Sequence, residues 1–360
     1  MPTPQRREAA IATLLGLVGL AALVAAWAAL RESVGHDYDL AAYLGAAARV
    51  AAGGTPYQPE TLGGPFRPGP AELYLYPPGL AVLLAPFAGL PGSLVSAGWF
   101  ALRVGALAAG CALMPVRPWI RGTSLLVAAA SYPVLLDVNL GNVSVVVFAL
   151  TAAAWRFLDR PFGSIAVAAA LALRPPLVVV VAWWALRRRW RPIAWALGAA
   201  VVLAALALPF VGLAGYTDYL VVVRNLTGMQ GVPRNADFGS LALAAGLPPP
   251  LPTLVFIGGM LAGLGIMLAG LRRDRDVAFV TAVGASLLLA PLLWVHYLVA
   301  LILPAALLAD RGRRWAILLP LLGWLPEPFL PFVAMIGALA PLLAAPPGGG
   351  ERQPVADLRP

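Results

Sequence analysis

Long apolar runs follow one another along almost the whole chain and are separated by short polar segments. The first run, residues 9–30, carries no charge over 22 residues and comes directly after Arg6 and Arg7. A helix of that length can cross the ~30 Å hydrocarbon core of a bilayer, and the run exceeds the ~7–15-residue core of a signal peptide. Ten further apolar runs follow, at 78–91, 94–114, 122–136, 143–158, 163–186, 192–212, 251–271, 277–291, 297–309 and 315–345.

These runs predict an all-α polytopic membrane protein with 11 or 12 transmembrane helices. The last run counts once or twice, because Pro326, Pro328 and Pro331 interrupt it. We expect a single integral membrane domain over residues 1–345, followed by a disordered tail over 346–360 that is rich in Pro, Gly and Arg.

Two longer polar segments, 31–77 and 213–250, interrupt the series of apolar runs. The first holds five tyrosines, several acids and many prolines and glycines. Both segments are predicted to be outer loops. Within the first, residues 39–52 have a helical composition, which predicts a juxtamembrane helix at the bilayer interface.

The arginines predict the orientation of the chain in the membrane. They gather in four short clusters, at 6–7, 187–191, 272–275 and 311–314, whereas the two outer loops hold at least as many acids as arginines. Loops rich in basic residues stay on the cytoplasmic side. We therefore expect a protein of the cell membrane with a cytoplasmic N-terminus. The side of the arginines near 117–121 and 156–160 stays open, since several apolar runs there are short.

Composition narrows the class of protein further. Hydrophobic residues make up 61% of the chain and charged residues 11%, too few charges for a soluble surface. The net charge of +9 does not predict nucleic-acid binding, because the arginines are scattered between apolar runs. A single cysteine excludes an intrachain disulfide and a zinc site built from several cysteines, and two histidines do not predict a His-rich metal site.

Ionisable and amide side chains near the outer ends of the apolar runs are the candidates for function. Asp39 could act as a general base on a hydroxyl group, or could cap the helix expected after it. Asn142 follows a glycine between two short runs, where it could bind a sugar or phosphate or form a capping turn. Arg174 lies beside two prolines inside an apolar run, where it could bind a phosphate or pair with Asp137 or another acid.

Later in the chain, His296 could bind a phosphate, orient an acid or lie solvated at the membrane rim, and Trp294 suits the interface. Asn235 belongs to the second outer loop, and Arg103 lacks an evident partner. An acid, several cations and aromatic rings thus converge near the outer surface. This combination favours a substrate with an anionic head and a long apolar tail.

Many of these residues fall in a pattern that resembles glycosyltransferase family 87. These are polyprenol-phosphate-mannose-dependent alpha-mannosyltransferase-like membrane enzymes of the GT-C type. The similar segments are Asp39 to Tyr43, Ala46 to Arg49, Gly53 to Tyr57, Tyr76 to Pro78, Gly141-Asn142, Arg174-Pro175, Asn235 and Trp294 to His296. The chain departs from the family pattern at Asn142 and Ser144, where Gln and Asn are usual, and at Tyr297, where a second His is usual.

The resemblance implies a cell-envelope glycosyltransferase that moves mannose, or a related hexose or pentose, from a polyprenyl-phosphate-sugar donor to a glycolipid or glycan acceptor. Transfer would take place on the extracytoplasmic side, with Asp39 as general base and Asp37 as its rival. The residues expected to bind the donor phosphate and sugar are Arg49, Tyr57, Asn142, Arg174, Asn235, Trp294 and His296. No cofactor is predicted, and the dependence on a divalent metal is left open.

Two other classes of function fit the same residues. A transporter or flippase of a lipid-linked sugar would use the same anion-binding groups but would need no base. A structural membrane subunit would tolerate changes at Arg174 and His296. The absence of a visible internal repeat counts against a secondary transporter.

Overall fold

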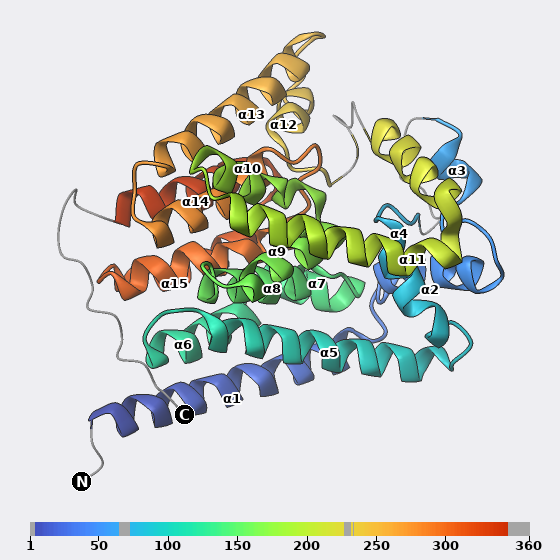
Figure 1. The fold of residues 1–360 in the computed structure, drawn as a ribbon. Coiled ribbons are helices and arrows are strands. Elements are labelled where there is room, and N and C mark those ends of the chain that lie inside the picture. The colour runs from blue at the N-terminus through green and yellow to red at the C-terminus, as the bar shows by residue number, and fades with distance from the viewer. Residues whose placement is uncertain (1–3, 65–72, 227–231, 233, 345–360) are drawn as a thin grey trace.

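The computed structural model describes residues 4–64, 73–226, 232 and 234–344, and all regular elements among them are helices. The α-helices are α1 (Pro4–Leu30), α2 (Tyr38–Ala51), α3 (Pro59–Leu62), α4 (Pro78–Leu84), α5 (Gly92–Leu113), α6 (Pro118–Ala129), α7 (Tyr132–Leu140), α8 (Ser144–Arg156), α9 (Pro161–Leu173), α10 (Val178–Leu186), α11 (Trp190–Asn225), α12 (Phe238–Ala244), α13 (Leu251–Gly270), α14 (Arg275–Leu288), α15 (Ile302–Asp310) and α16 (Leu330–Leu339). The 3-10 helices are η1 (Ala85–Phe87), η2 (Pro175–Leu177), η3 (Val295–Leu301), η4 (Arg314–Trp324), η5 (Glu327–Phe329) and η6 (Ala340–Ala344). The predicted all-α class is confirmed (Figure 1). The tail expected to be disordered lies outside the described residues.

Fewer helices than expected are long enough to cross a bilayer. Among the described residues, five helices qualify by length and composition: Arg6–Leu30, Gly92–Leu113, Trp190–Asn225, Leu251–Gly270 and Glu327–Ala344. A sixth is formed if α6 and α7, which meet at 62°, count as one bent span. The remaining apolar runs form helices of 10–17 residues, so the described part of the chain contains five or six full-length spans rather than 11 or 12. Short helices at membrane depth are tolerated where protein covers their ends.

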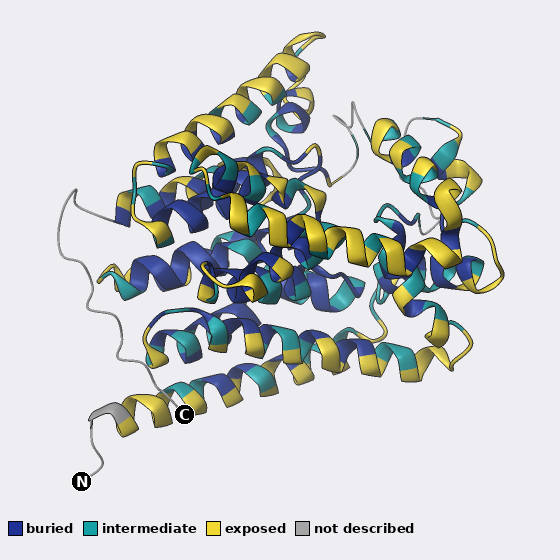
Figure 2. Ribbon diagram, viewed as in Figure 1, coloured by how far each residue is buried: buried dark blue, intermediate teal, exposed yellow. Residues whose placement is uncertain are grey.

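The core and the outer surface differ in the way expected of a protein surrounded by lipid. Every residue of α14 from Val277 to Leu288 is buried, as befits a helix enclosed on all sides. By contrast, α1, α11 and α13 display large apolar side chains, and Figure 2 shows long exposed stretches along all three. Exposed apolar surface of this extent indicates contact with a membrane. The chain is therefore a multi-pass membrane protein.

Helix α11 extends into the segment that was expected to be an outer loop. Its two limbs meet at Gly212, whose φ of 61° is a backbone conformation that residues with a side chain rarely adopt. The second limb continues to Asn225, where the amide donates to the backbone of Thr61 at 2.9 Å. Much of the segment 213–250 is thus helical, and its first part is tied to α3.

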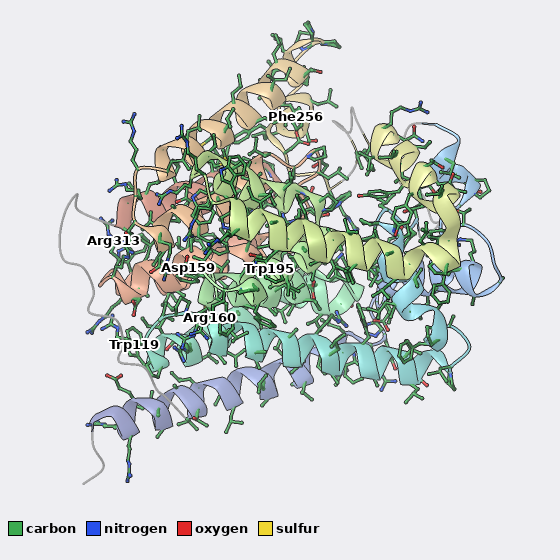
Figure 3. The ribbon with its side chains drawn as sticks, viewed as in Figure 1. Trp119, Asp159, Arg160, Trp195, Phe256 and Arg313 are labelled. Atoms are coloured by element: carbon green, nitrogen blue, oxygen red, sulfur yellow. The ribbon has the colours of Figure 1, made fainter. Side chains whose placement is uncertain are left out.

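The arginine-rich loops lie together at one end of the molecule. Ion pairs join them: Arg117–Asp310, Arg189–Asp159, Arg275–Asp159 and Arg311–Asp274. Figure 3 shows Asp159, Arg160 and Arg313 on this side. The loops around Arg117 and Arg160, whose side the sequence left open, therefore belong with the other clusters. The first half of α1 also packs against the start of α6, which places the N-terminus at the same end.

The contact between α1 and α6 depends on glycine at position 122. A Cβ atom there would lie 2.3 Å from the carbonyl oxygen of Ala12, which is backbone and cannot easily move. Small residues let membrane helices approach closely in this way. We expect Gly122→Ala to destabilise the protein by about 1–3 kcal/mol, measured as a lower thermal unfolding midpoint in detergent. Gly98→Ala on α5, where a Cβ meets nothing within 4 Å, is the matched control. An unchanged midpoint for Gly122→Ala would contradict the packing.

Candidate functional site

Helix α2, which carries Asp39, lies at the end of the molecule opposite Asp159, Arg160 and Arg313 (Figures 1 and 3). Helix α2 begins at Tyr38, two residues earlier than a cap at Asp39 requires, because Asp37 occupies the N-cap position with a left-handed backbone, φ 55°. The Asp37 N–H donates to the carbonyl oxygen of Asn139 at 2.7 Å, which fixes the start of the helix. Asp39 therefore does not cap α2. Its Oδ2 instead accepts a hydrogen bond of 2.7 Å from Asn142.

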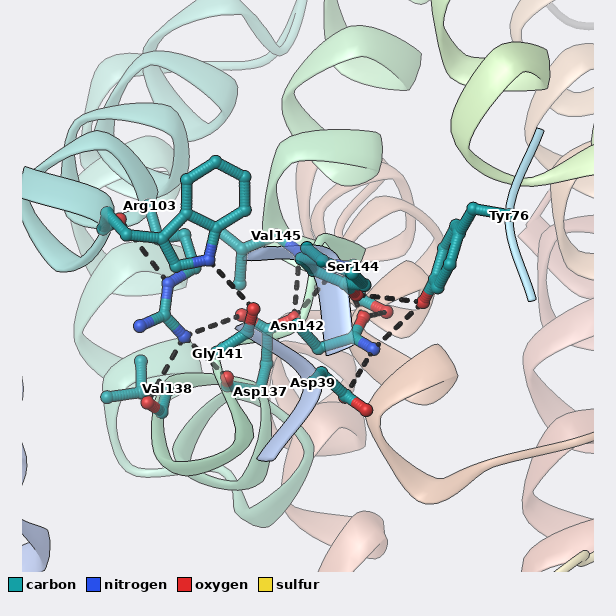
Figure 4. A network of polar contacts seen from close by, with 11 residues as sticks. Asp39, Tyr76, Arg103, Asp137, Val138, Gly141, Asn142, Ser144 and Val145 are labelled. Carbon is teal, nitrogen blue, oxygen red and sulfur yellow. Dashed lines mark hydrogen bonds and ion pairs between the residues drawn. The ribbon is translucent and has the colours of Figure 1, made fainter. Parts of the chain in front are cut away.

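Asn142 lies in the tight turn between α7 and α8. The turn requires Gly141, whose φ is 74° and where a Cβ atom would lie 2.7 Å from the Cβ of Leu40. The Oδ1 atom of Asn142 accepts from both the N–H and the hydroxyl of Ser144, each at 2.9 Å. Its Nδ2 donates to Asp39 and, at 3.1 Å, to the hydroxyl of Tyr76 (Figure 4). All the polar atoms of the Asn142 side chain are thus engaged within the protein, and one of its partners is Asp39.

A cluster of tyrosines surrounds these two residues. The Tyr43 hydroxyl donates to that of Tyr76 at 3.0 Å, and their rings meet edge to face at 5.1 Å. Tyr57, predicted to bind the donor, is 1% exposed and donates its hydroxyl to the carbonyl oxygen of Tyr76 at 2.9 Å. Tyr57 therefore positions Tyr76. Sequence reasoning placed Tyr43 and Tyr76 in the family-like stretches but did not identify them as site residues, although their repeated occurrence there was the available signal.

Burial changes the acidity of Asp39. It raises the pKa of this carboxyl to about 6, against the opposing effects of the hydrogen bond from Asn142 and the charge of Arg103. A carboxyl group with a pKa near the working pH suits proton transfer better than an ordinary aspartate does.

Asp39 and Asn142 form one half of the site, and a buried cation, Arg174, forms the other. Arg174 lies between α9 and η2, is 6% exposed, and stacks its guanidinium 4.0 Å above the ring of Tyr297. Among the described residues, no acceptor bonds its Nε or Nη2 atoms. The alternative pairing with Asp137 is wrong, because Asp137 lies 3.8 Å from Arg103 instead. Buried guanidinium N–H groups without acceptors are suited to bind an anion.

His296 lies close to this cation, and Trp294 lies two residues earlier in the chain. His296 is 6% exposed rather than solvated at the rim, and its ring meets that of Tyr297 edge to face at 4.9 Å. Trp294 is half-buried and precedes η3. Asn235 accepts from the Leu293 N–H at 3.0 Å and donates to Asp237. Asn235 therefore holds the chain just before Trp294 in place.

Tyr76 and Tyr297 connect the two halves of the site. Arg174 interacts electrostatically with both tyrosines, and Tyr297 interacts in turn with Asp39. The structure thus brings together Asp39, Asn142, Arg174 and His296 from distant parts of the sequence. Arg49 lies apart, at the other end of α2. It donates to the carbonyl oxygen of Pro56 and lines an open cavity of about 680 Å³.

In the part of the chain that the structure describes, no three His, Cys, Asp or Glu side chains are grouped closely enough to hold a metal ion.

The fold and the site define a multi-pass membrane protein in which a buried carboxyl group and a buried arginine face a common cluster of tyrosines. A sequence model of glycosyltransferase family 87 matches residues 74–294, more than half of the chain. The chain belongs to this family, and it is a membrane glycosyltransferase that uses a sugar donor and an acceptor. Comparisons with curated proteins and with solved structures gave no match.

Proposed function

We propose that the protein transfers a sugar, mannose or a related hexose or pentose, from a polyprenyl-phosphate donor to a glycolipid or glycan of the cell envelope. One observation carries the proposal. The carboxylate of Asp39, held at one oxygen by Asn142, shares its tyrosine cluster with Arg174, whose buried N–H groups lack acceptors among the described residues. A base and an anion site close together are what an acceptor hydroxyl and a lipid phosphate require.

In the proposed reaction, Asp39 accepts the proton of the acceptor hydroxyl as that oxygen attacks the anomeric carbon of the donor sugar. The new glycosidic bond forms while the bond from the anomeric carbon to the phosphate oxygen breaks. The bonding electron pair leaves with the polyprenyl phosphate, and Arg174 stabilises the added negative charge. His296, beside Tyr297, completes the wall of the anion site. Asn142 holds the carboxylate toward the reacting hydroxyl.

A donor panel tests the proposal directly. The purified protein is reconstituted in vesicles that contain a membrane glycolipid extract and is given polyprenyl phosphates carrying mannose, arabinose or glucose. We expect release of free polyprenyl phosphate and labelled glycolipid with at least one donor. Movement of intact donor across the bilayer without release from any of them would favour the flippase function and contradict the transferase.

The orientation of the site in the membrane can be tested by cysteine labelling. We propose that the Asp39 end faces outward, because the arginine-rich loops gather at the other end. In a Cys111→Ala background, cysteines at the exposed positions Val34 and Ala245 are expected to react with an impermeant maleimide in intact cells. A cysteine at Arg313 should react only after permeabilisation. Labelling of Val34 and Ala245 from opposite sides would overturn the scheme.

The acidity of Asp39 predicts how turnover depends on pH. The base must be ionised to accept a proton, and its pKa is raised by burial to about 6. We therefore expect kcat/KM to rise with pH up to about 6 and to level off above it. The measurement is a pH–rate profile with the active donor, with unfolding followed at each pH as a control. An acidic limb near the ordinary aspartate pKa of ~3.9 would contradict the assignment.

A further inference from the structure

Two side chains of helix α5, one helical turn apart, bond to the backbone at the turn that contains Asn142. Arg103 is fully buried, and its Nη1 donates to the carbonyl oxygens of Asp137 at 2.5 Å and Val138 at 3.1 Å. Trp99 donates its Nε1–H to the carbonyl oxygen of Gly141 at 2.8 Å. The carbonyls of Asp137 and Val138 belong to the last turn of α7, and that of Gly141 belongs to its C-cap residue. The dipole of a helix favours a cation at this end.

The side chain of Asp137 continues this connection into α8. One carboxylate oxygen lies 3.8 Å from Arg103, and the other accepts from the N–H groups of Ser144 at 2.9 Å and Val145 at 3.3 Å. These N–H groups open α8, where an anion is favoured. A fully buried ion pair thus links the end of one helix to the beginning of the next (Figure 4).

Ser144 determines which way the amide of Asn142 points. A backbone N–H can only donate, so the amide atom that faces it must be the oxygen. The Ser144 hydroxyl donates to the same oxygen. The NH₂ group of Asn142 is thereby turned toward Asp39 and Tyr76. If α8 began elsewhere, the amide would lose the two bonds that fix its orientation.

We propose that Arg103 and Asp137 are positioning residues for the transfer reaction, acting through Ser144 and Asn142 on the carboxylate of Asp39. Neither side chain needs to touch substrate. The ion pair fixes the turn between α7 and α8 so that Asn142 holds Asp39 toward the acceptor. This inference rests on the proposed function, because it takes Asp39 as the base. A displacement of about 1 Å of a catalytic group can lower a rate by ~10²-fold, so the pair should affect turnover rather than donor binding.

The test removes both charges together. A lone buried charge costs several kcal/mol, whereas Arg103→Gln combined with Asp137→Asn keeps the approximate volume and polar atoms. The control is Arg117→Gln with Asp310→Asn, which removes an ion pair at the arginine-rich end whose arginine is half exposed. We expect the Arg103/Asp137 variant to bind polyprenyl-phosphate mannose within about twofold of wild type but to lower kcat at least roughly 10-fold. The control pair should change neither value.

A mutant cycle with Asn142→Ala separates positioning from a general structural defect. If the ion pair acts through Asn142, adding Asn142→Ala to the pair variant should lower kcat no further than Asn142→Ala alone does. Losses that multiply, or a pair variant with wild-type kcat, would overturn the inference. If the pair variant does not fold, Ser144→Ala replaces it in the same cycle with the same criterion. Asp39→Asn is measured alongside: normal turnover there refutes the proposed base, whereas an inactive Asp39→Asn with a normal pair variant refutes the positioning alone.

Discussion

Replacing Asp39 with asparagine is expected to lower turnover by about 10²–10⁴-fold, the usual loss when a positioned base is removed. The amide oxygen can still accept from Asn142, so the contact that holds the residue is retained. Donor binding and the thermal unfolding midpoint should therefore stay close to wild type. Turnover is measured as released polyprenyl phosphate, and binding is measured separately with the same donor.

Asp37→Asn is the matched control for this prediction. Asp37 lies two residues earlier at the start of α2, and its carboxylate faces His36 at 3.4 Å rather than Asn142. We expect a much smaller loss of turnover from this change. If Asp37→Asn is inactive and Asp39→Asn is active, the general base is Asp37 and not Asp39. Normal turnover in both variants would remove the basis for a base-assisted transfer.

Arg174→Ala is expected to weaken donor binding by on the order of 10²-fold. Two hydrogen bonds from a guanidinium to a phosphate are each worth roughly 1.5–3 kcal/mol, and Nε and Nη2 are the groups without acceptors among the described residues. Arg174→Lys should keep part of the affinity, since it keeps the charge but loses the planar donors. The measurement is the affinity for polyprenyl phosphate in detergent micelles.

The exposed Arg234 provides the control for Arg174. Like Arg174, Arg234 does not belong to the arginine-rich loops. We expect Arg234→Ala to leave the affinity for polyprenyl phosphate unchanged. The thermal unfolding midpoint of Arg174→Ala should fall only slightly, because the change removes a contact with the Tyr297 ring worth about 0.5–2 kcal/mol and, among the described residues, no ion pair. Normal affinity in Arg174→Ala would make the residue structural and would relocate the phosphate site.

The sequence alone predicted the fold class because hydropathy is a local property of the chain. It overestimated the number of full-length spans, since run length does not reveal where a helix stops. The run at 163–186, for example, divides at Arg174 and Pro175 into two short helices. The sequence left the loop around Arg117 unassigned, and its place beside the other arginine clusters follows only from a contact with Asp310, nearly two hundred residues later.

The sequence indicated which residues belong to the candidate site better than it indicated which of them contact one another. Asn142 and Arg174 stood out because polar groups are rare in apolar runs. Nothing in the sequence indicates which buried cation meets Asp137, because a choice between Arg103 and Arg174 depends on how distant helices pack. Tyr76 escaped notice because tyrosines are common near membrane interfaces, and its role follows only from its contacts with Asn142 and Tyr43.

The buried pair of Arg103 and Asp137 also constrains how the chain is inserted during synthesis. Arg103 leaves the ribosome 34 residues before Asp137, a delay of roughly 2–7 s at ~5–20 residues per second. During that time α5 carries a cation without its partner, at a cost of about 2.5–3.5 kcal/mol if it enters lipid alone. Helices α5, α6 and α7 are therefore expected to leave the translocon together, with the arginine already neutralised. Biogenesis of the site would then begin with a helical hairpin, long before the residues around Tyr297 are made.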